Sequence, residues 1–264
     1  MATIGIGIDP IIISLGPFAL SWHSLFMVVA MVVGVWFIAR LVAKAGLSTD
    51  RLYSLAIWAI LGGIIGARLV HVVDYWDDYM ADPGAILAFW KGGLALWGGI
   101  LGGTLATVTF ARIRGYPLAR YADIGALGLI LGQAIGRIGD IINGEHFSTT
   151  TDLPWGVVYT HPNSPSYSLP PQHPAVAYEL LMDLLIFGLL WKLLGPFKPD
   201  GSLFLLYLVI YSAGRFFLSF LRLDSNTVIR GLNQAQWLSL IVLAVALPLL
   251  LFWQTSRSKR KPLS

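Results

Sequence analysis

Polar and charged side chains that could do chemistry gather in one short run of this 264-residue sequence, GQAIGRIGDIINGE at 132–145. The run holds Arg137, Asp140, Asn143 and Glu145, although the residues before it are largely apolar. An ionisable side chain at the centre of a lipid bilayer costs about 2.5 to 3.5 kcal/mol on insertion scales, so it is expected to have a partner or a function. The run is therefore the first candidate for a functional site.

The spacing of polar residues predicts two helical stripes. In the first, Gln133, Arg137 and Asp140 follow spacings of four and three, which place them on one face of a helix. The same kind of spacing aligns a second set: Tyr211, Arg215, Ser219 and Arg222. A guanidinium group binds a phosphate through two parallel hydrogen bonds. We therefore expect the two stripes to face each other and their arginines to bind the anionic head of a phospholipid near the outer leaflet.

A structural alternative stays open for these arginines. Arg137 would pair with Asp140 or Glu145, and Arg215 with Asp224, only to stabilise helix packing. A third arginine, Arg68, also lies inside an apolar segment, and the carboxylates near the three do not obviously saturate three guanidinium groups. Charges inside membrane segments are functional candidates by default.

The composition indicates an integral membrane protein. Hydrophobic residues make up 56% of the chain and charged residues only 12%, whereas soluble domains carry about 25% charged residues. The net charge of +4 does not indicate nucleic-acid binding, because basic residues crowd the tail at 257–261, where we expect contact with anionic lipid. The chain has no cysteine, so any thiol that reacts must come from a substrate.

Windows of about 20 apolar residues predict an all-α, polytopic fold with about seven transmembrane helices in a single membrane domain over 1–264. The predicted spans are 22–41, 52–73, 85–110, 121–142, 175–194, 202–222 and 237–253. Lys and Arg residues concentrate after the first, third, fifth and seventh spans. By the positive-inside rule, the N-terminus then lies outside and the C-terminus in the cytoplasm. The segment 143–174 is accordingly predicted to form a small external head.

Glycine pairs in the third apolar segment, Gly98 with Gly102 and Gly99 with Gly103, give small-xxx-small spacings. Such spacings let helix backbones approach closely in lipid, and we favour packing over ligand contact on the motif alone.

Histidines offer few candidates for a metal site. His146, His161 and His173 are too scattered for the spacing of a metal-binding helix pair, and we expect no metal. His23 follows Trp22 at the start of the first span, where it is either an interfacial residue or part of a site.

Four motifs resemble the prolipoprotein diacylglyceryl transferases of bacterial inner membranes. They are GRIGDIINGE (136–145), TDLPWGVVY (151–159), HPAVAYELL (173–181) and YSAGRFFLSFLR (211–222). Three shorter stretches also match that family and lie in the expected order along the chain: GARLVHVV (66–73), KGGLALWGG (91–99) and QWLSL (236–240). The resemblance covers nearly the whole chain.

The resemblance implies a multi-pass inner-membrane enzyme without a cofactor. Such an enzyme moves the diacylglyceryl group of phosphatidylglycerol onto the lipobox cysteine thiol of a prolipoprotein signal peptide, leaving a thioether and releasing glycerol phosphate. The implied catalytic residues are Arg137 and Arg215 on the phosphate, Tyr211 at the headgroup, and Glu145 and Asp140 orienting an arginine. The implied substrate-binding residues are Arg68, Asn143, Gly136, Gly139, Gly98, Gly99 and His23.

Five positions depart from the usual pattern of that family. Trp97 stands where the family usually has a histidine, and His23 stands where it has a tyrosine. Asp140 replaces an asparagine, Ser148 replaces a glycine and Ser219 replaces a glutamate. If the missing histidine accepts the thiol proton elsewhere, then His23, Asp140 or Glu145 would substitute for it here. Alternatively no dedicated base is needed, because a thiol of pKa about 8.5 is partly ionised and nearby arginines lower that pKa further.

Two rival functions follow from the same residues. A paralogue that binds phospholipid or lipopeptide without turnover would explain the five departures. A transporter or channel would also carry charges within its helices, but no inverted repeat is visible in the sequence.

Overall fold

The computed structural model describes residues 3–15, 18–87, 93–223, 227–229 and 231–258, and it is mostly helical. The chain divides into two compact units, Met1–Ile38 with Ala122–Ser264, and Ala39–Tyr121. Asp224 and most of the basic tail lie outside the described residues.

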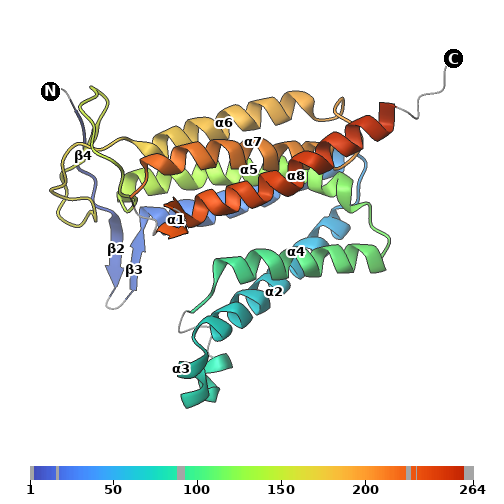
Figure 1. Ribbon diagram of the computed structural model, residues 1–264, viewed down its shortest axis with the longest axis horizontal. Coiled ribbons are helices and arrows are strands. Elements are labelled where there is room, and N and C mark those ends of the chain that lie inside the picture. The colour runs from blue at the N-terminus through green and yellow to red at the C-terminus, as the bar shows by residue number, and fades with distance from the viewer. Residues whose placement is uncertain (1–2, 16–17, 88–92, 224–226, 230, 259–264) are drawn as a thin grey trace. The chain divides into compact units, whose positions relative to one another are not determined.

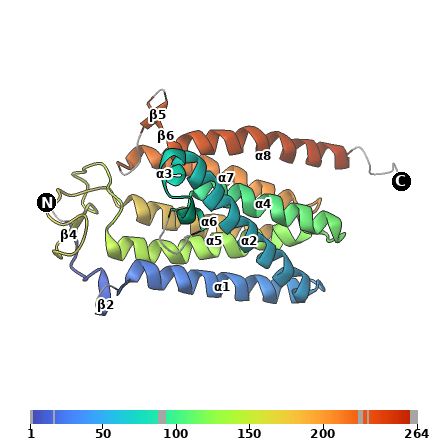
Figure 2. The same ribbon diagram turned by 90° about the horizontal axis from the view of Figure 1, so that it is seen from below.

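Five helices form the body of the first unit, and Figures 1 and 2 show them running alongside one another. They are α1 (Trp22–Lys44), α5 (Leu118–Asn143), α6 (Ala175–Leu193), α7 (Ser202–Leu218) and α8 (Gln234–Ser258). A short 3₁₀ helix, η3 (Ser219–Leu221), extends α7. Glycines let α1 and α5 approach: a Cβ at Gly139 would lie 2.9 Å from His23 Cα and 3.0 Å from the carbonyl oxygen of Trp22.

The second unit is built on α2 (Thr49–Asp74) and α4 (Leu96–Ile113), with α3 (Trp76–Ala81) and the 3₁₀ helix η1 (Pro83–Leu87) between them. Ser48 caps α2, since its hydroxyl accepts a hydrogen bond from the backbone N–H of Arg51. The two long helices pack through glycines: a Cβ at Gly98 would lie 2.1 Å from the carbonyl oxygen of Gly66. These contacts agree with the packing interpretation of the glycine pairs.

Five of the described helices are long and apolar enough to cross a membrane. They are Trp22–Lys44, Thr49–Asp74, Leu118–Asn143, Ser202–Leu221 and Gln234–Thr255. The third predicted span began too early, because helix α4 starts only at Leu96. Before it, Gly93 adopts a left-handed backbone conformation with φ of +76°, which a continuous helix does not allow.

Short strands outside the long helices are a departure from the all-α prediction. Strand β1 (Ile4–Ile6) pairs in parallel with β4 (Val157–Tyr159), β2 (Ile11–Leu15) pairs with β3 (Phe18–Ser21), and β5 (Thr227–Ile229) pairs with β6 (Leu232–Asn233). Period and hydropathy signals are weak in strands of two to five residues, which is why the sequence did not reveal them.

The segment 143–174 contains one strand, β4, and otherwise consists of turns and bends held by hydrogen bonds. Besides the β1 and β4 pairing, its backbone is tied to the end of the α7 and η3 helical stretch: the N–H of Thr149 donates to the carbonyl of Leu221, at 2.8 Å. The buried side chain of Gln172 accepts a hydrogen bond from the N–H of Ser148, at 2.7 Å. Figure 1 shows this folded segment beside the C-terminal end of α5 and the N-terminal end of α6.

Candidate functional site

Three arginines of the first unit converge on one buried carboxylate, Glu179 of α6. The Nη2 atom of Arg137, from α5, lies 3.0 Å from Glu179 Oε2, and the Nη1 atom of Arg215, from α7, bonds Oε1. Arg222, just after η3, places its Nη1 atom 3.2 Å from Oε1. The side chain of Glu179 is only 1% exposed. The two predicted stripes therefore meet, with a protein carboxylate between them.

Three guanidinium groups of this cluster share Glu179, and Arg137 has a second carboxylate partner, Asp140. Arg137 and Arg215 are 17% and 18% exposed, whereas Arg222 is 5% exposed, so the first two offer the more accessible guanidinium groups. The Nε atom of Arg137 is buried and has no hydrogen-bond partner in the described part of the chain. An unpaired buried donor is costly, at about 1 to 3 kcal/mol. An anionic oxygen would satisfy it.

Asp140 joins the arginine cluster to two histidines. Its Oδ2 atom accepts a hydrogen bond from Arg137 Nη1, at 3.0 Å, and its Oδ1 atom lies 2.6 Å from His23 Nδ1. His146 Nε2 is 3.6 Å from Oδ2, and His146 Nδ1 lies 2.7 Å from Arg222 Nη2. The structural alternative for Arg137, pairing with Asp140, is thus present in the structure together with the bond to Glu179.

The end of helix α5 positions Asn143 and Glu145. Asn143 accepts a hydrogen bond from the backbone N–H of His23, at 3.2 Å, and its Nδ2 atom donates to Glu145 Oε1, at 3.1 Å. Gly144 ends the helix with φ of +66°, and a Cβ there would lie 2.5 Å from the hydroxyl oxygen of Ser164. Only glycine fits both the conformation and the space.

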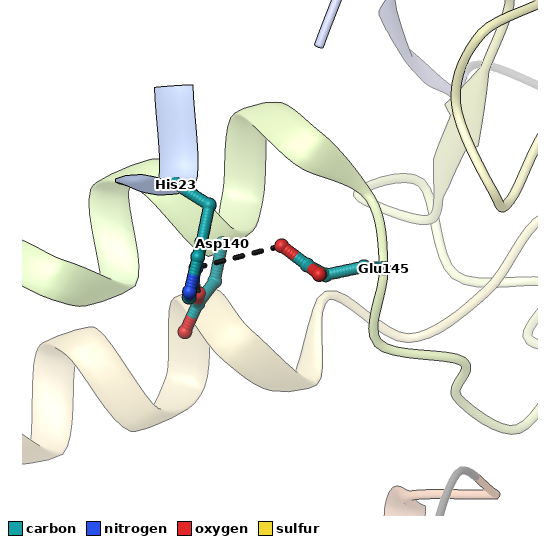
Figure 3. A group of neighbouring side chains, drawn as sticks. All are labelled: His23, Asp140 and Glu145. Atoms are coloured by element: carbon teal, nitrogen blue, oxygen red, sulfur yellow. Dashed lines mark hydrogen bonds and ion pairs between the residues drawn. The ribbon is translucent and has the colours of Figure 1, made fainter. Parts of the chain in front are cut away.

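One group of described residues could also hold a metal ion: His23, Asp140 and Glu145. Their donor atoms all lie within 4.8 Å of one another. Figure 3 shows His23 from the start of α1, Asp140 from the last turn of α5 and Glu145 from the segment after it, pointing toward one another. A histidine nitrogen with two carboxylates is a donor set that divalent cations accept, but Asp140 already carries an arginine on its other oxygen.

Tyr211 lies one helical turn before Arg215, with its ring centroid 5.8 Å from that of Tyr207. Tyr207 in turn donates a hydrogen bond from its hydroxyl to Gln133 Oε1, at 3.0 Å. The polar stripe of α5 therefore continues from Arg137 to Gln133, one helical turn earlier, and contacts α7 there. Gly136 and Gly139 lie on the α5 face that contacts α1, where a Cβ on Gly136 would lie 3.3 Å from Met27 Sδ.

Arg68 belongs to the second unit and is held by backbone carbonyls. Its Nε atom donates to Ile86 O at 2.9 Å, its Nη1 atom donates to Gly93 O at 2.8 Å, and its Nη2 atom donates to the carbonyl of Ala85. The guanidinium carbon also lies 5.0 Å from the ring centroid of Tyr79. These contacts fasten the connection before α4. Gly98 and Gly99 line the α2 contact described above.

An apolar cavity of about 530 Å³ opens beside the site in the first unit. Its wall includes Ile6 from β1, Val157 from β4, Tyr178 from α6 and His146 from the site. Burial, and secondarily the charge of Asp140, raise the pKa of Tyr159 in this wall to about 12. Its hydroxyl donates to the carbonyl of Ile141, at 2.8 Å. Tyr159 therefore stays protonated at neutral pH and does not act as a base.

Sequence reasoning missed Glu179, which organises the site, and gave His146 no role in it. The signal was available in the fifth predicted span, where Glu179 and Asp183 stand four residues apart and so share one helix face. Both are buried, and the carboxylate oxygens of Asp183 have no hydrogen-bond partner among the described residues. The rule that singled out buried arginines applies equally to these carboxylates.

Comparison with known proteins matches residues 10–253 to the family model described as prolipoprotein diacylglyceryl transferase. Three similar relatives carry the name phosphatidylglycerol–prolipoprotein diacylglyceryl transferase. One from a Nostoc species is 37% identical and covers 90% of this chain and 87% of its own. One from Dehalococcoides mccartyi is 34% identical over 96% and 97%, and one from Gloeobacter violaceus is 36% identical over 96% and 95%. The resemblance seen in the motifs is confirmed.

Proposed function

Because the chain belongs to the prolipoprotein diacylglyceryl transferase family, we propose that it transfers the diacylglyceryl group of phosphatidylglycerol to the lipobox cysteine thiol of bacterial prolipoproteins. Thioether formation releases glycerol phosphate. This reaction is the first step of lipoprotein maturation, and it takes place in the inner membrane.

One observation carries the proposal at the level of residues: Arg137 and Arg215, from different helices, reach the same point, and both are partly accessible. There the phosphate of the lipid displaces or joins Glu179 and accepts hydrogen bonds from both guanidinium groups. It also satisfies the unpaired Nε–H of Arg137. Arg222 stays on Glu179 and holds that carboxylate in place.

The chemistry then needs chiefly electrostatic stabilisation. The peptide sulfur attacks the glycerol carbon that carries the phosphate, a carbon–sulfur bond forms and the carbon–oxygen bond breaks. The bonding electron pair leaves with the phosphate oxygen as glycerol phosphate. Preorganised arginines stabilise the negative charge that develops on the leaving oxygens, which is usually the largest catalytic term. Their positive charge also lowers the pKa of an incoming thiol.

The proposed arrangement in the membrane has seven spans. Helices α4 and α6 join the five that are apolar enough by themselves, because each lies at a predicted span and packs against one of those five. The positive-inside rule puts the N-terminus and the 143–174 segment outside and the C-terminus in the cytoplasm. The prolipoprotein then reaches the site through the head.

A transfer assay with the purified protein tests the proposal. The protein in detergent is mixed with labelled phosphatidylglycerol and a lipobox peptide, and thioether product is measured by mass spectrometry. The wild type should form product, Arg137→Ala and Arg215→Ala should abolish it, and Trp97→Phe should not. Arg120→Ala is the matched control, because this exposed arginine lies in the second unit, where it donates a hydrogen bond to the carbonyl of Ala45. Normal activity in both arginine variants of the site would refute the mechanism.

The occupied arginines also favour a second candidate, a protein that binds lipid without turnover. In this reading Glu179 holds Arg137 and Arg215 too firmly for the phosphate to be activated. Binding of labelled phosphatidylglycerol with no thioether product, from a folded wild type, would support it. Any thioether product excludes it.

A further inference from the structure

His23 is held in one tautomer by its surroundings. Its Nδ1 atom lies 2.6 Å from Asp140 Oδ1 and 3.4 Å from Glu145 Oε1. Both neighbours are carboxylate oxygens, which only accept, so Nδ1 carries the proton and donates it. In the described part of the chain, Nε2 makes no hydrogen bond. A neutral ring in this position presents an unprotonated Nε2, and 36% of the side chain is exposed.

His146, the other histidine on Asp140, has the opposite arrangement. Its Nδ1 atom faces Arg222 Nη2 at 2.7 Å, and a guanidinium group can only donate, so Nδ1 must accept. Its Nε2 atom faces the other oxygen of Asp140, at 3.6 Å. Both nitrogens are therefore engaged, and protonation at Nδ1 would bring two cations together. His23 differs, because its Nε2 atom makes no hydrogen bond to any described residue.

Packing fixes the ring of His23 beside the arginine cluster. The start of α1 rests on Gly139, one residue before Asp140, and the backbone N–H of His23 bonds the side chain of Asn143. Asp140 is itself held by Arg137. The histidine, its carboxylate and an arginine of the proposed phosphate site thus form one connected chain of contacts.

We propose that His23 is the catalytic base of the transfer, with Nε2 accepting the proton of the substrate thiol, and that Asp140 and Glu145 are positioning residues that hold its tautomer. This inference rests on the proposed function. The thiol S–H bond breaks, the proton goes to Nε2, and the thiolate attacks the glycerol carbon while the phosphate oxygen leaves. The imidazolium then returns its proton to water. A carboxylate that orients a histidine base has the same role in serine hydrolases.

The pH dependence of His23→Gln is the main test. A base contributes about 100-fold to 10,000-fold, so transfer at pH about 7 should fall by at least roughly 100-fold. The loss should shrink as the pH rises past about 8.5, where a thiol ionises without help. The charged groups of the described chain that face His23 are Asp140, from α5, and Glu145, after it. Equal rates of wild type and variant at every pH would overturn the proposal.

His161→Gln is the matched control for this variant. His161 is also a histidine beside a carboxylate, with Nε2 3.8 Å from Asp9 Oδ2, but it lies in the head and outside the site. Its substitution should leave the pH profile unchanged. If His23→Gln binds labelled phosphatidylglycerol normally yet stays inactive even at high pH, His23 has a structural role and the proposal fails.

A measurement on the wild type covers the case in which His23→Gln does not fold. A lipobox peptide with selenocysteine in place of cysteine carries a selenol that is already ionised at neutral pH. The wild type should then lose the fall in rate that it shows at low pH with the cysteine peptide. An identical pH profile for both peptides would overturn the proposal. If the wild type makes no product from either peptide, the proposed function itself fails.

A chelator distinguishes two roles for His23, Asp140 and Glu145: a catalytic base with its positioning residues, or a metal-binding site. With His23 as the base, EDTA should leave wild-type transfer unchanged. Loss of activity in EDTA and recovery with Zn²⁺ would assign His23 Nδ1 to a metal ion and overturn the proposal.

Discussion

Two buried arginine environments, one in each unit, show what an arginine in an apolar segment can mean. Around Glu179, the guanidinium groups of Arg137 and Arg215 share a carboxylate and keep part of their surface accessible. Arg68 instead donates to carbonyls of the chain segment before α4. The sequence context of the three is similar, and their partners differ. Charge inside a membrane segment therefore marks a candidate, and the chemistry of the partner decides its role.

Paired Arg→Lys substitutions should separate the two environments most strongly. Arg215→Lys keeps the charge but loses the planar fork that matches a phosphate, so we expect transfer to fall by about 100-fold or more. Arg68→Lys should lower thermal stability in detergent and leave the transfer rate within a few-fold. Loss of transfer in Arg68→Lys at unchanged stability would instead make Arg68 a substrate-binding residue, as the sequence motif implies.

Glu179→Gln tests whether lipid and carboxylate compete for the same arginines. The variant keeps the shape but leaves three guanidinium groups without their shared anion, and breaking such a buried pair costs up to about 3 to 5 kcal/mol. Added phosphatidylglycerol should therefore raise the melting temperature of the variant more than that of the wild type, because a ligand stabilises the state that binds it. Equal shifts would mean that the phosphate does not reach this point.

Glycine substitutions compare packing in the two units. Gly98→Ala forces a Cβ to 2.1 Å from the carbonyl oxygen of Gly66 and should destabilise the second unit by about 1 to 3 kcal/mol. Gly139→Ala pushes on the backbone of His23 and should lower transfer more than its effect on stability explains. Gly188→Ala, with nothing within 4 Å of the added carbon, is the matched control for both.

The smallest expected effect is that of Tyr159→Phe, in the cavity wall. Losing the hydrogen bond to Ile141 O should cost about 1 kcal/mol at neutral pH. In the wild type the folded-state pKa of Tyr159 is about 12, above the ordinary value of 10.0. The unfolded chain thus loses this proton first, and stability falls as the pH rises from 10 toward 12. The melting temperature of Tyr159→Phe should therefore fall less than that of the wild type between pH 10 and pH 12.

Local sequence patterns predicted most of the helices and the Arg137 and Asp140 pair, because hydropathy and helical spacing are local properties. The start of α4 was misplaced, since the apolar residues 85–87 belong to a short 3₁₀ helix. Glu179 as the shared partner, and His23 on Asp140, could not be derived from spacing. Both contacts join residues that are far apart in the chain, 42 and 117 positions respectively, and they depend on how helices are packed.

The parallel pairing of β1 with β4 sets an order of events during synthesis. Residues 4–6 leave the ribosome first, but their partner strand begins at Val157. At about 5 to 20 residues per second, the ribosome needs roughly 8 to 30 seconds to make the intervening chain. The amino-terminal strand must therefore wait, unpaired, until helices α1 to α5 have been made. The pairing of β1 is therefore completed only after the chain has been translated through Tyr159.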